Sequence, residues 1–158
     1  MALWPFGVHD REHPSLGVVL VVDDEESVRK ISRLTLTKAG YEVIEAGNGQ
    51  EGLQRLDGRK IHLIVSDVNM PIMDGFATCR QLKSRERTRH IPVIFLTVAT
   101  ELDRRLEGLS IGAVDYICKP FHSEEVIARI QIHLELAHAI AAKNPTHDAQ
   151  THDEDRPR

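Results

Sequence analysis

The sequence predicts an α/β fold in which five parallel strands alternate with five helices in one domain. Short apolar runs recur along the chain, and a run such as Ile61, Leu63, Ile64 and Val65, bounded by turn residues, is typical of a strand buried on both faces. Segments with helical spacing of apolar residues lie between these runs, joined by short connections. This alternation is typical of a doubly wound sheet with helices on both faces.

The strands are expected at residues 17–22, 41–46, 61–66, 91–96 and 113–118, and the first four helices at 25–39, 49–57, 75–83 and 101–110. A fifth helix is expected to begin at Ser123. Asn48 and Asp74 are suited to cap helix starts, and Gly40 and Gly112 to end helices. The apolar faces are expected to comprise Val28, Ile31, Leu34 and Leu36 in the first helix, Leu53 and Leu56 in the second, Leu102, Leu106 and Leu109 in the fourth, and Val126, Ile130 and Leu134 in the fifth.

Length and composition suit one globular domain. The chain has 158 residues, 41% of them hydrophobic and 28% charged, with a net charge of -4 spread along the sequence. There is no basic patch for nucleic acid, no signal peptide and no apolar run of the roughly 20 residues that span a membrane, so we expect a cytoplasmic protein. The two cysteines lack metal-ligand spacing. We expect a disordered leader at 1–16, the domain at 17–142 and a disordered tail at 143–158.

Polar side chains stand where four of the strands end. Asp23 and Asp24 follow the first strand, and Asp67 follows the third. Thr97 and Lys119 follow the fourth and fifth strands. In a parallel sheet these endings share one edge, where open α/β sheets bind their ligands. Each residue alone has an ordinary explanation, as a helix cap for the acids or Thr97, or as a surface cation for Lys119, but their joint occurrence favours a site.

The chemistry of such a site would centre on a divalent cation and a phosphoryl group. Three carboxylates held together repel one another and require a cation, and oxygen ligands with room for water suit Mg²⁺ (or Mn²⁺). With metal bound, the Asp67 carboxylate can act as a nucleophile toward phosphorus. Lys119 and the Thr97 hydroxyl would then contact phosphoryl oxygens, since phosphoryl transfer needs mainly alignment and charge stabilisation.

The order Asp-Asp, Asp, Thr and Lys-Pro, with MPxMDG after the central acid, resembles a response-regulator receiver domain over about residues 17–136. The resemblance implies a flavodoxin-like (βα)5 fold with strand order 2-1-3-4-5. It implies that Asp67 accepts phosphate from a sensor histidine kinase or histidine phosphotransfer protein and that the protein is no classical enzyme. It also implies metal binding by Asp24 and Asp67 directly, by the Asn69 backbone carbonyl, and by Asp23 through water.

The resemblance further implies a conformational switch. Thr97 would move toward the phosphoryl group while Tyr116 turns inward, altering the face formed by the fourth helix, fifth strand and fifth helix. That face would bind an effector protein or a second copy of the chain. Candidate interface residues are Leu102, Leu106, Ile111 and Val114.

Three residues depart from the pattern of the family. Val98 stands where a smaller residue is typical and is expected to narrow access to the site. Ile111 and Val114 are apolar where small or acidic residues are common, and they would extend an exposed patch if both face the solvent. The nine histidines are expected to be solvated side chains.

The sequence leaves several functions open. The chain could be a single-domain receiver, or a receiver fragment of a longer response regulator or hybrid kinase. A Mg²⁺-dependent phosphohydrolase with Asp67 as nucleophile is the alternative, although Asn69 occupies the position where such enzymes commonly carry a second acid. Flavin or nucleotide binding would require a glycine-rich phosphate loop after the first strand, which is missing.

Overall fold

A computed structural model of the chain describes residues 15–98 and 104–143. Its five strands form one parallel sheet in the order β2-β1-β3-β4-β5, which confirms the predicted fold class and strand order. The strands are β1 (Val18–Val22), β2 (Glu42–Ala46), β3 (Leu63–Ser66), β4 (Val93–Val98) and β5 (Asp115–Lys119).

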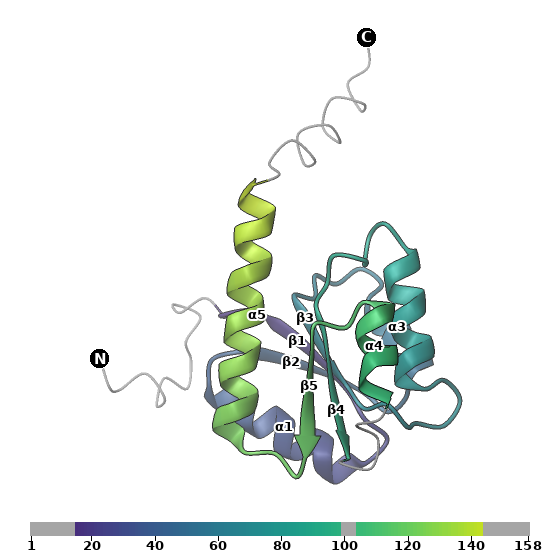
Figure 1. Cartoon of the computed structure of the whole chain (residues 1–158). Helices are drawn as coiled ribbons and strands as arrows, with labels where there is room; N and C mark the ends of the chain where they lie inside the picture. The colour runs from purple at the N-terminus through teal and green to yellow at the C-terminus, as the bar shows by residue number, and fades with distance from the viewer. Residues whose placement is uncertain (1–14, 99–103, 144–158) are drawn as a thin grey trace.

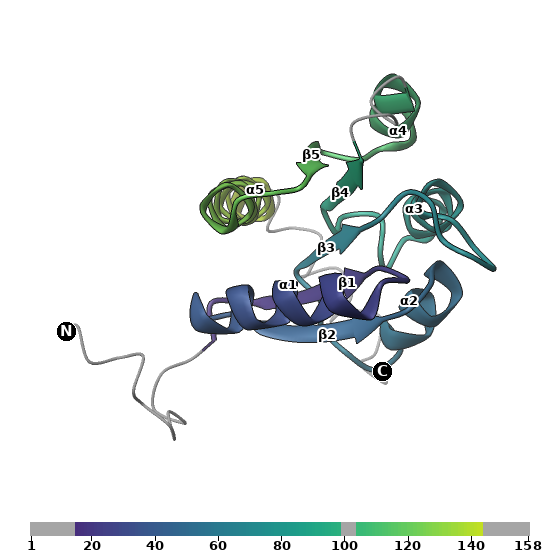
Figure 2. The ribbon, with the colours of Figure 1, turned by 90° about the horizontal axis from the view of Figure 1, so that it is seen from below.

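Five helices cover the two faces of the sheet. They are α1 (Glu26–Lys38), α2 (Gly49–Arg55), α3 (Gly75–Ser84), α4 (Arg105–Ile111) and α5 (Ser123–Lys143). Figure 1 shows α5 standing apart from α3 and α4, and the view from below in Figure 2 places α1 and α5 on one face and α2, α3 and α4 on the other.

The central strands β1, β3 and β4 are buried on both faces, as their apolar sequences predict, whereas the edge strand β2 (EVIEA) is mostly half-buried. Successive side chains of a strand point to opposite faces, so Val19 and Val21 belong to one core cluster while Leu20 and Val22 belong to the other. Tyr41 and Ile130 complete the cluster beneath α1 and α5. The sheet therefore carries two separate hydrophobic cores.

The helix ends follow the capping residues of the sequence. The Asn48 side chain accepts a hydrogen bond from the Glu51 backbone N–H, and Asp74 caps α3 in the same way through Ala77. Gly40 and Gly112 have φ angles of 104° and 124°, in the left-handed region that favours glycine. These boundary predictions are confirmed.

β4 and β5 lie one or two residues further along the chain than predicted. β4 covers 93–98 and β5 covers 115–119, whereas 91–96 and 113–118 were expected. Pro92 has no N–H to donate, and the pairing of β3 with β4 begins with Ile64 opposite Val93. Thr97 is consequently a strand residue, and Lys119 is the last residue of β5.

Two predicted helix faces are wrong in part, although Leu36 and Val28 of the first helix do pack on the core. In α1, Ile31 and Leu34 are 53% and 57% exposed, because the side that packs on the sheet carries Ser32 and Leu36. In α4, Leu106 is 78% exposed. The buried residue of the described α4 is instead Gly108, and Leu102 lies outside the described residues.

Three further expectations concern the chain ends, membrane spans and the cysteines. Most of the predicted leader and tail lies outside the described residues. Within 15–98 and 104–143, no helix combines the length and hydrophobicity that crossing a membrane requires. Cys79 is buried and Cys118 is half-buried, both as free thiols.

Candidate functional site

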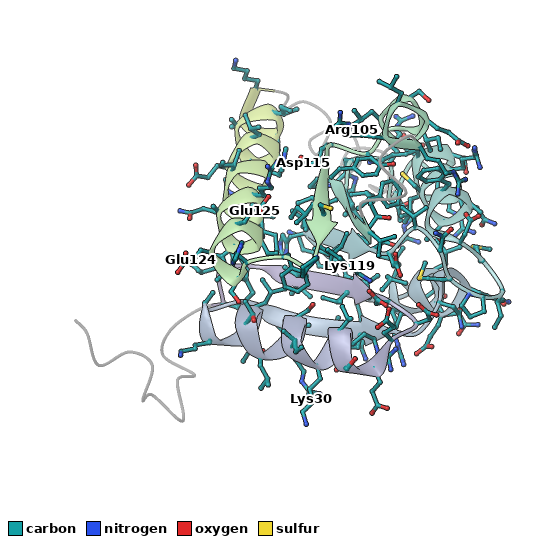
Figure 3. All side chains as sticks on the ribbon, turned by 60° about the horizontal axis from the view of Figure 1, so that its bottom comes forward. Lys30, Arg105, Asp115, Lys119, Glu124 and Glu125 are labelled. Carbon is teal, nitrogen blue, oxygen red and sulfur yellow. The ribbon has the colours of Figure 1, made fainter. Side chains whose placement is uncertain are left out.

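The carboxyl ends of the strands bring the predicted site residues to one edge of the sheet. Register pairs Val22 with Ser66, so Asp23 and Asp67 follow neighbouring strands at the same level. The Asp67 backbone N–H donates to the Val22 carbonyl at 2.9 Å. In Figure 3, Lys119 lies at the end of β5 nearest this edge.

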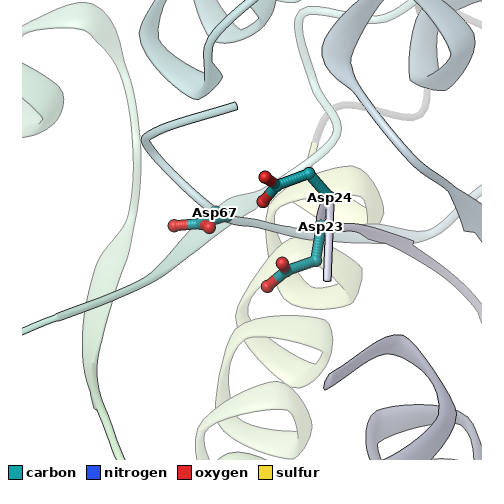
Figure 4. A group of neighbouring side chains, drawn as sticks. All are labelled: Asp23, Asp24 and Asp67. Atoms are coloured by element: carbon teal, nitrogen blue, oxygen red, sulfur yellow. The ribbon is translucent and has the colours of Figure 1, made fainter. Parts of the chain in front are cut away.

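Three carboxylates form the centre of the site. One carboxylate oxygen from each of Asp23, Asp24 and Asp67 lies within 4.8 Å of the other two, and Figure 4 shows the three side chains together. Asp23 is 1% exposed and Asp67 is 9% exposed, whereas Asp24 faces the solvent. A cluster that is buried on one side and open on the other suits an ion that keeps some of its water.

Lys119 lies between two of these acids. Its Nζ is 2.8 Å from Asp23 Oδ2 and 3.4 Å from Asp67 Oδ2. Burial opposes the charge of Lys119, but the hydrogen bond and charge of Asp23, followed by the charge of Asp67, raise its pKa. It is therefore no solvated surface cation, and it offsets one of three negative charges.

The positive charge near Asp67 does not balance the effects of its burial and of the neighbouring Asp23 carboxylate. Burial and then the charge of Asp23 raise its pKa, while Lys119 and the Val68 backbone N–H, 2.7 Å from Oδ1, lower it. The raised pKa shows that the ionised form is unfavourable in the protein alone. A divalent cation beside the three carboxylates would relieve this repulsion, so the residues fit Mg²⁺.

Thr97 contributes a buried hydroxyl without a partner. The residue is 1% exposed, and its Oγ1 makes no hydrogen bond within the part of the chain that the structure describes. Such unsatisfied groups are uncommon and often have a functional cause. Cys118, its register partner on β5, precedes Lys119, so the hydroxyl lies on the strand beside the lysine.

Glycine allows the helical layer to approach the acid closely. A Cβ atom at Gly75 would overlap the carbonyl oxygen of Asp67 and would come within 3.0 Å of the Phe95 ring. The Gly75 N–H donates to the Val68 carbonyl at 2.7 Å. The start of α3 is therefore fixed directly against the backbone that carries Asp67.

Tyr116 points inward. It is 8% exposed, its ring centroid lies 5.2 Å from that of Phe95, and its hydroxyl donates to the Arg104 carbonyl at 3.4 Å. Burial raises its pKa to about 12. A Cβ at Gly108 would overlap the Tyr116 hydroxyl and approach its Cζ to 2.8 Å, so the glycine leaves the space that the ring occupies.

The remaining predicted residues are more dispersed. Asn69 is exposed two residues after Asp67, and Val98, 45% exposed, lies opposite Lys119 in the sheet. Val114 is 40% exposed, but Ile111 is half-buried against the core. The apolar patch that both residues would form if exposed is therefore reduced to Val114.

Sequence reasoning missed a second charged cluster. Arg129 Nη1 lies 2.8 Å and His133 Nε2 2.9 Å from the two oxygens of Asp115. His62 is also bound, since its Nδ1 accepts the Val18 backbone N–H at 2.9 Å. The expectation that all histidines are merely solvated is wrong for these two. The spacing of four between Arg129 and His133 was the available signal, because it places both on one side of α5.

Comparisons with known proteins agree with this fold. Residues 19–131 match the family model of the response regulator receiver domain. Over 113 residues, or 72% of the chain, it is 45% identical to "Probable transcriptional regulator ycf27" of Pyropia yezoensis, covering 45% of that protein. The corresponding identity is 42% for the phosphate regulon transcriptional regulatory protein PhoB of Pseudomonas aeruginosa, of which 49% is covered.

Solved structures give the same result. The chemotaxis protein CheY4 of Vibrio cholerae is 35% identical with a TM-score of 0.70, covering 74% of this chain and 98% of that one. The chain spans less than half the length of the curated relatives it matches.

Proposed function

This chain belongs to the response regulator receiver domain family, and we propose that it is a phosphoacceptor of two-component signalling in which Asp67 takes the phosphoryl group. An Asp67 carboxylate oxygen attacks the phosphorus of a phosphohistidine. A P–O bond forms while the P–N bond breaks, and the leaving imidazole takes up a proton. The donor is a sensor histidine kinase or a histidine phosphotransfer protein.

The acid cluster supports a role for Mg²⁺. Asp24 and Asp67 would bind the ion through their side chains, Asn69 through its backbone carbonyl and Asp23 through water. When bound, the cation would offset the charge that keeps an anionic donor away from Asp67. The support for this assignment is the convergence of three carboxylates with one lysine.

Lys119 and Thr97 supply the remaining stabilisation. The Lys119 ammonium is placed to leave Asp67 Oδ2 for a phosphoryl oxygen while it keeps Asp23 as a partner. The unpaired Thr97 hydroxyl would donate to another phosphoryl oxygen. The single observation that carries the proposal is the meeting of these two donors with the three acids at one sheet edge.

Mass spectrometry after incubation with acetyl phosphate and Mg²⁺ tests the proposal. We expect one phosphoryl group on Asp67, none in the Asp67→Asn variant, and none when EDTA removes the metal. Asp57→Asn, which changes an exposed acid in the turn after α2, is the matched control and should label normally. Labelling that persists in Asp67→Asn would contradict the assignment.

Tyr116 is proposed as the second element of the switch. Tyr116→Ala should leave Asp67 labelling intact and weaken binding of the effector. Gly108→Ala should displace the ring without removing it, because the added methyl group takes the position of the hydroxyl. Ring resonances of Tyr116 in NMR spectra would report the displacement. Unchanged resonances in Gly108→Ala would show that the added methyl group does not displace the ring.

Val98 is proposed to limit access to the acyl phosphate. Its β-branched side chain is 45% exposed at the end of β4. We expect Val98→Ala to lose its phosphoryl group several-fold faster than the wild type, measured by phosphate release after removal of acetyl phosphate. An equal or slower rate would exclude this role.

The output of the protein is proposed at the level of protein contact. The face of α4, β5 and α5 would bind an effector or a second copy, and Leu106 and Val114 are exposed on it. The relatives are named as transcriptional regulators, but the net charge of -4 of this chain gives no support for direct DNA binding. The limits of the domain at 17–142, the disordered ends and the cytoplasmic location stay predictions.

A further inference from the structure

The side chain of Arg29 reaches from α1 to the backbone of the acid cluster. Its Nη1 donates a hydrogen bond to the carbonyl oxygen of Asp23 at 2.6 Å. That carbonyl belongs to the planar peptide group that joins Asp23 to Asp24, so the hydrogen bond fixes the plane from which the Asp24 backbone continues. The Arg29 side chain is 20% exposed, and a hydrogen bond from a charged donor is stronger than one between neutral groups.

The two neighbouring acids are held in different ways. The Asp23 carboxylate has a donor on each oxygen, with the Glu25 backbone N–H 3.0 Å from Oδ1 and Lys119 Nζ 2.8 Å from Oδ2. The Asp24 side chain is exposed, and no group within residues 15–98 and 104–143 donates a hydrogen bond to its carboxylate. The direction of this carboxylate therefore depends on its own backbone, and hence on the peptide group that Arg29 holds.

Glu45 keeps Arg29 in place. Register pairs Glu45 of β2 with Val21 of β1, so it lies beside the strand that leads to Asp23, and α1 lies next to β2 on this side of the sheet (Figure 2). Glu45 Oε1 is 3.6 Å from Arg29 Nε, and Oε2 is 3.0 Å from Arg33 Nη1. The carboxylate thus balances the charge of Arg29 and holds its guanidinium group through Nε while Nη1 contacts the Asp23 carbonyl.

We propose that Arg29 is a positioning residue of the cation site. By holding the peptide group between Asp23 and Asp24, it directs the Asp24 carboxylate toward an ion beside Asp67, and Glu45 holds Arg29 in turn. This inference rests on the proposed Mg²⁺ site and adds two residues that touch neither the ion nor the phosphoryl group. Through them, α1 and the edge strand β2 contribute to the geometry of the site.

The charge of Arg29 and its positioning role predict opposite effects of its removal. A positive charge near three carboxylates repels a divalent cation, so if Arg29 acted through its charge alone, its loss would tighten cation binding. If Arg29 acts by holding the peptide group, its loss allows Asp24 other conformations, and the entropy cost of ordering it again weakens cation binding. The sign of the change in cation affinity therefore separates the two roles.

Cation affinity of the full chain, measured by electron paramagnetic resonance of Mn²⁺ and by competition with Mg²⁺, tests the proposal. We expect Arg29→Met to bind the cation about tenfold more weakly than the wild type, the scale of ordering one residue. Lys30→Met is the matched control, because it removes an equal charge from the next residue of α1, and Figure 3 shows Lys30 pointing away from the sheet. It should bind as the wild type does. Unchanged or tighter binding in Arg29→Met overturns the proposal, as does equal weakening in Lys30→Met.

Arg29→Lys keeps the charge and carries the same test if Arg29→Met does not fold. A lysine has one nitrogen and cannot contact Glu45 and the Asp23 carbonyl through separate atoms of a planar group. We expect cation binding several-fold weaker than that of the wild type, and wild-type affinity in Arg29→Lys would overturn the need for the guanidinium group.

The contribution of Glu45 is tested in two backgrounds. Glu45→Gln should weaken cation binding in the wild type and have little further effect in Arg29→Met, because Glu45 acts through Arg29. Equal losses in both backgrounds would overturn this part of the proposal.

The Asp24 backbone amide gives a readout that needs no metal. Its nitrogen and proton resonances in NMR spectra respond to the hydrogen bond that the preceding carbonyl accepts. In EDTA they should shift in Arg29→Met and stay in place in Lys30→Met, and unshifted resonances in Arg29→Met would contradict the positioning role. A wild-type chain that binds no cation would overturn the Mg²⁺ site together with this inference. A wild type that binds the cation, with Arg29→Met binding equally well, overturns only the role of Arg29.

Discussion

Asp67, which follows β3, and Asp115, which begins β5, are both acids with restricted exposure to solvent, but their surroundings shift their pKa values in opposite directions. At Asp115, burial is outweighed by hydrogen bonds from His133 and Arg129, and its pKa is lowered. At Asp67, burial and the charge of Asp23 outweigh a shared lysine, and its pKa is raised. The Asp115 carboxylate, whose charge is balanced by protein groups, forms a structural contact. The Asp67 carboxylate, whose charge is not balanced, lies where a ligand is expected.

The largest change in the free energy of unfolding is expected from removing Lys119, which lies beside Asp23 and Asp67. Lys119→Met leaves Asp23 buried without a cation, and breaking a buried pair costs about 3 kcal/mol. The free energy of unfolding measured with urea in EDTA should fall by that amount, and Mg²⁺ should restore part of it. Lys38→Met, at an exposed position on α1, is the control. A loss no larger than that of the control would show that the pair is not needed for stability.

The next largest change in the free energy of unfolding is expected at Asp115. Asp115→Asn weakens the contacts with Arg129 and His133 and should cost about 2 kcal/mol near pH 7. Because the folded-state pKa of Asp115 is lowered, its contribution is present above its unfolded pKa and is lost as pH falls through the folded value. The difference between wild type and variant should therefore shrink below about pH 4. A difference independent of pH would contradict the charge-based account.

The smallest change is expected at Asp67, where substitution should stabilise the protein instead of destabilising it. Because the pKa of Asp67 is raised, its ionised form destabilises the fold as pH rises through that value. Without metal at pH 7, Asp67→Asn should be more stable than the wild type by ~1 kcal/mol, the scale of two like charges about 4 Å apart. Saturating Mg²⁺ should stabilise the wild type preferentially. Thermal unfolding with EDTA and with Mg²⁺ measures both, and a variant less stable than wild type in EDTA would refute the argument.

Much of this fold could be predicted because the central strands β1, β3 and β4 are apolar on both faces. Uniform runs such as that ending at Val22 indicate a parallel sheet, and a parallel sheet places Asp23 and Asp67 at one edge. The strand order itself came from the resemblance, since nothing in the periodicity says which strand lies beside β1. The metal, phosphoryl and switch roles of the site residues stay predictions.

The errors arose where burial depends on partners distant in sequence. The sheet-facing side of α1 contains Ser32, so helical spacing of apolar residues alone selected Ile31 and Leu34 incorrectly. In α4, Gly108 is buried because the Tyr116 ring fills the space beside it, and apolar periodicity does not detect a glycine. His133 lies 18 residues from Asp115, so their contact depends on how α5 packs.

The close approach at Gly75 has a mechanical consequence. With no side chain between the first residue of α3 and the Asp67 carbonyl, the strand end and the helix cannot shift independently. A displacement of the Asp67 backbone would move α3 as a rigid rod, and its far end would travel with it. The acid is thus coupled to the α2-α3-α4 layer through main-chain atoms, on the sheet face opposite α5.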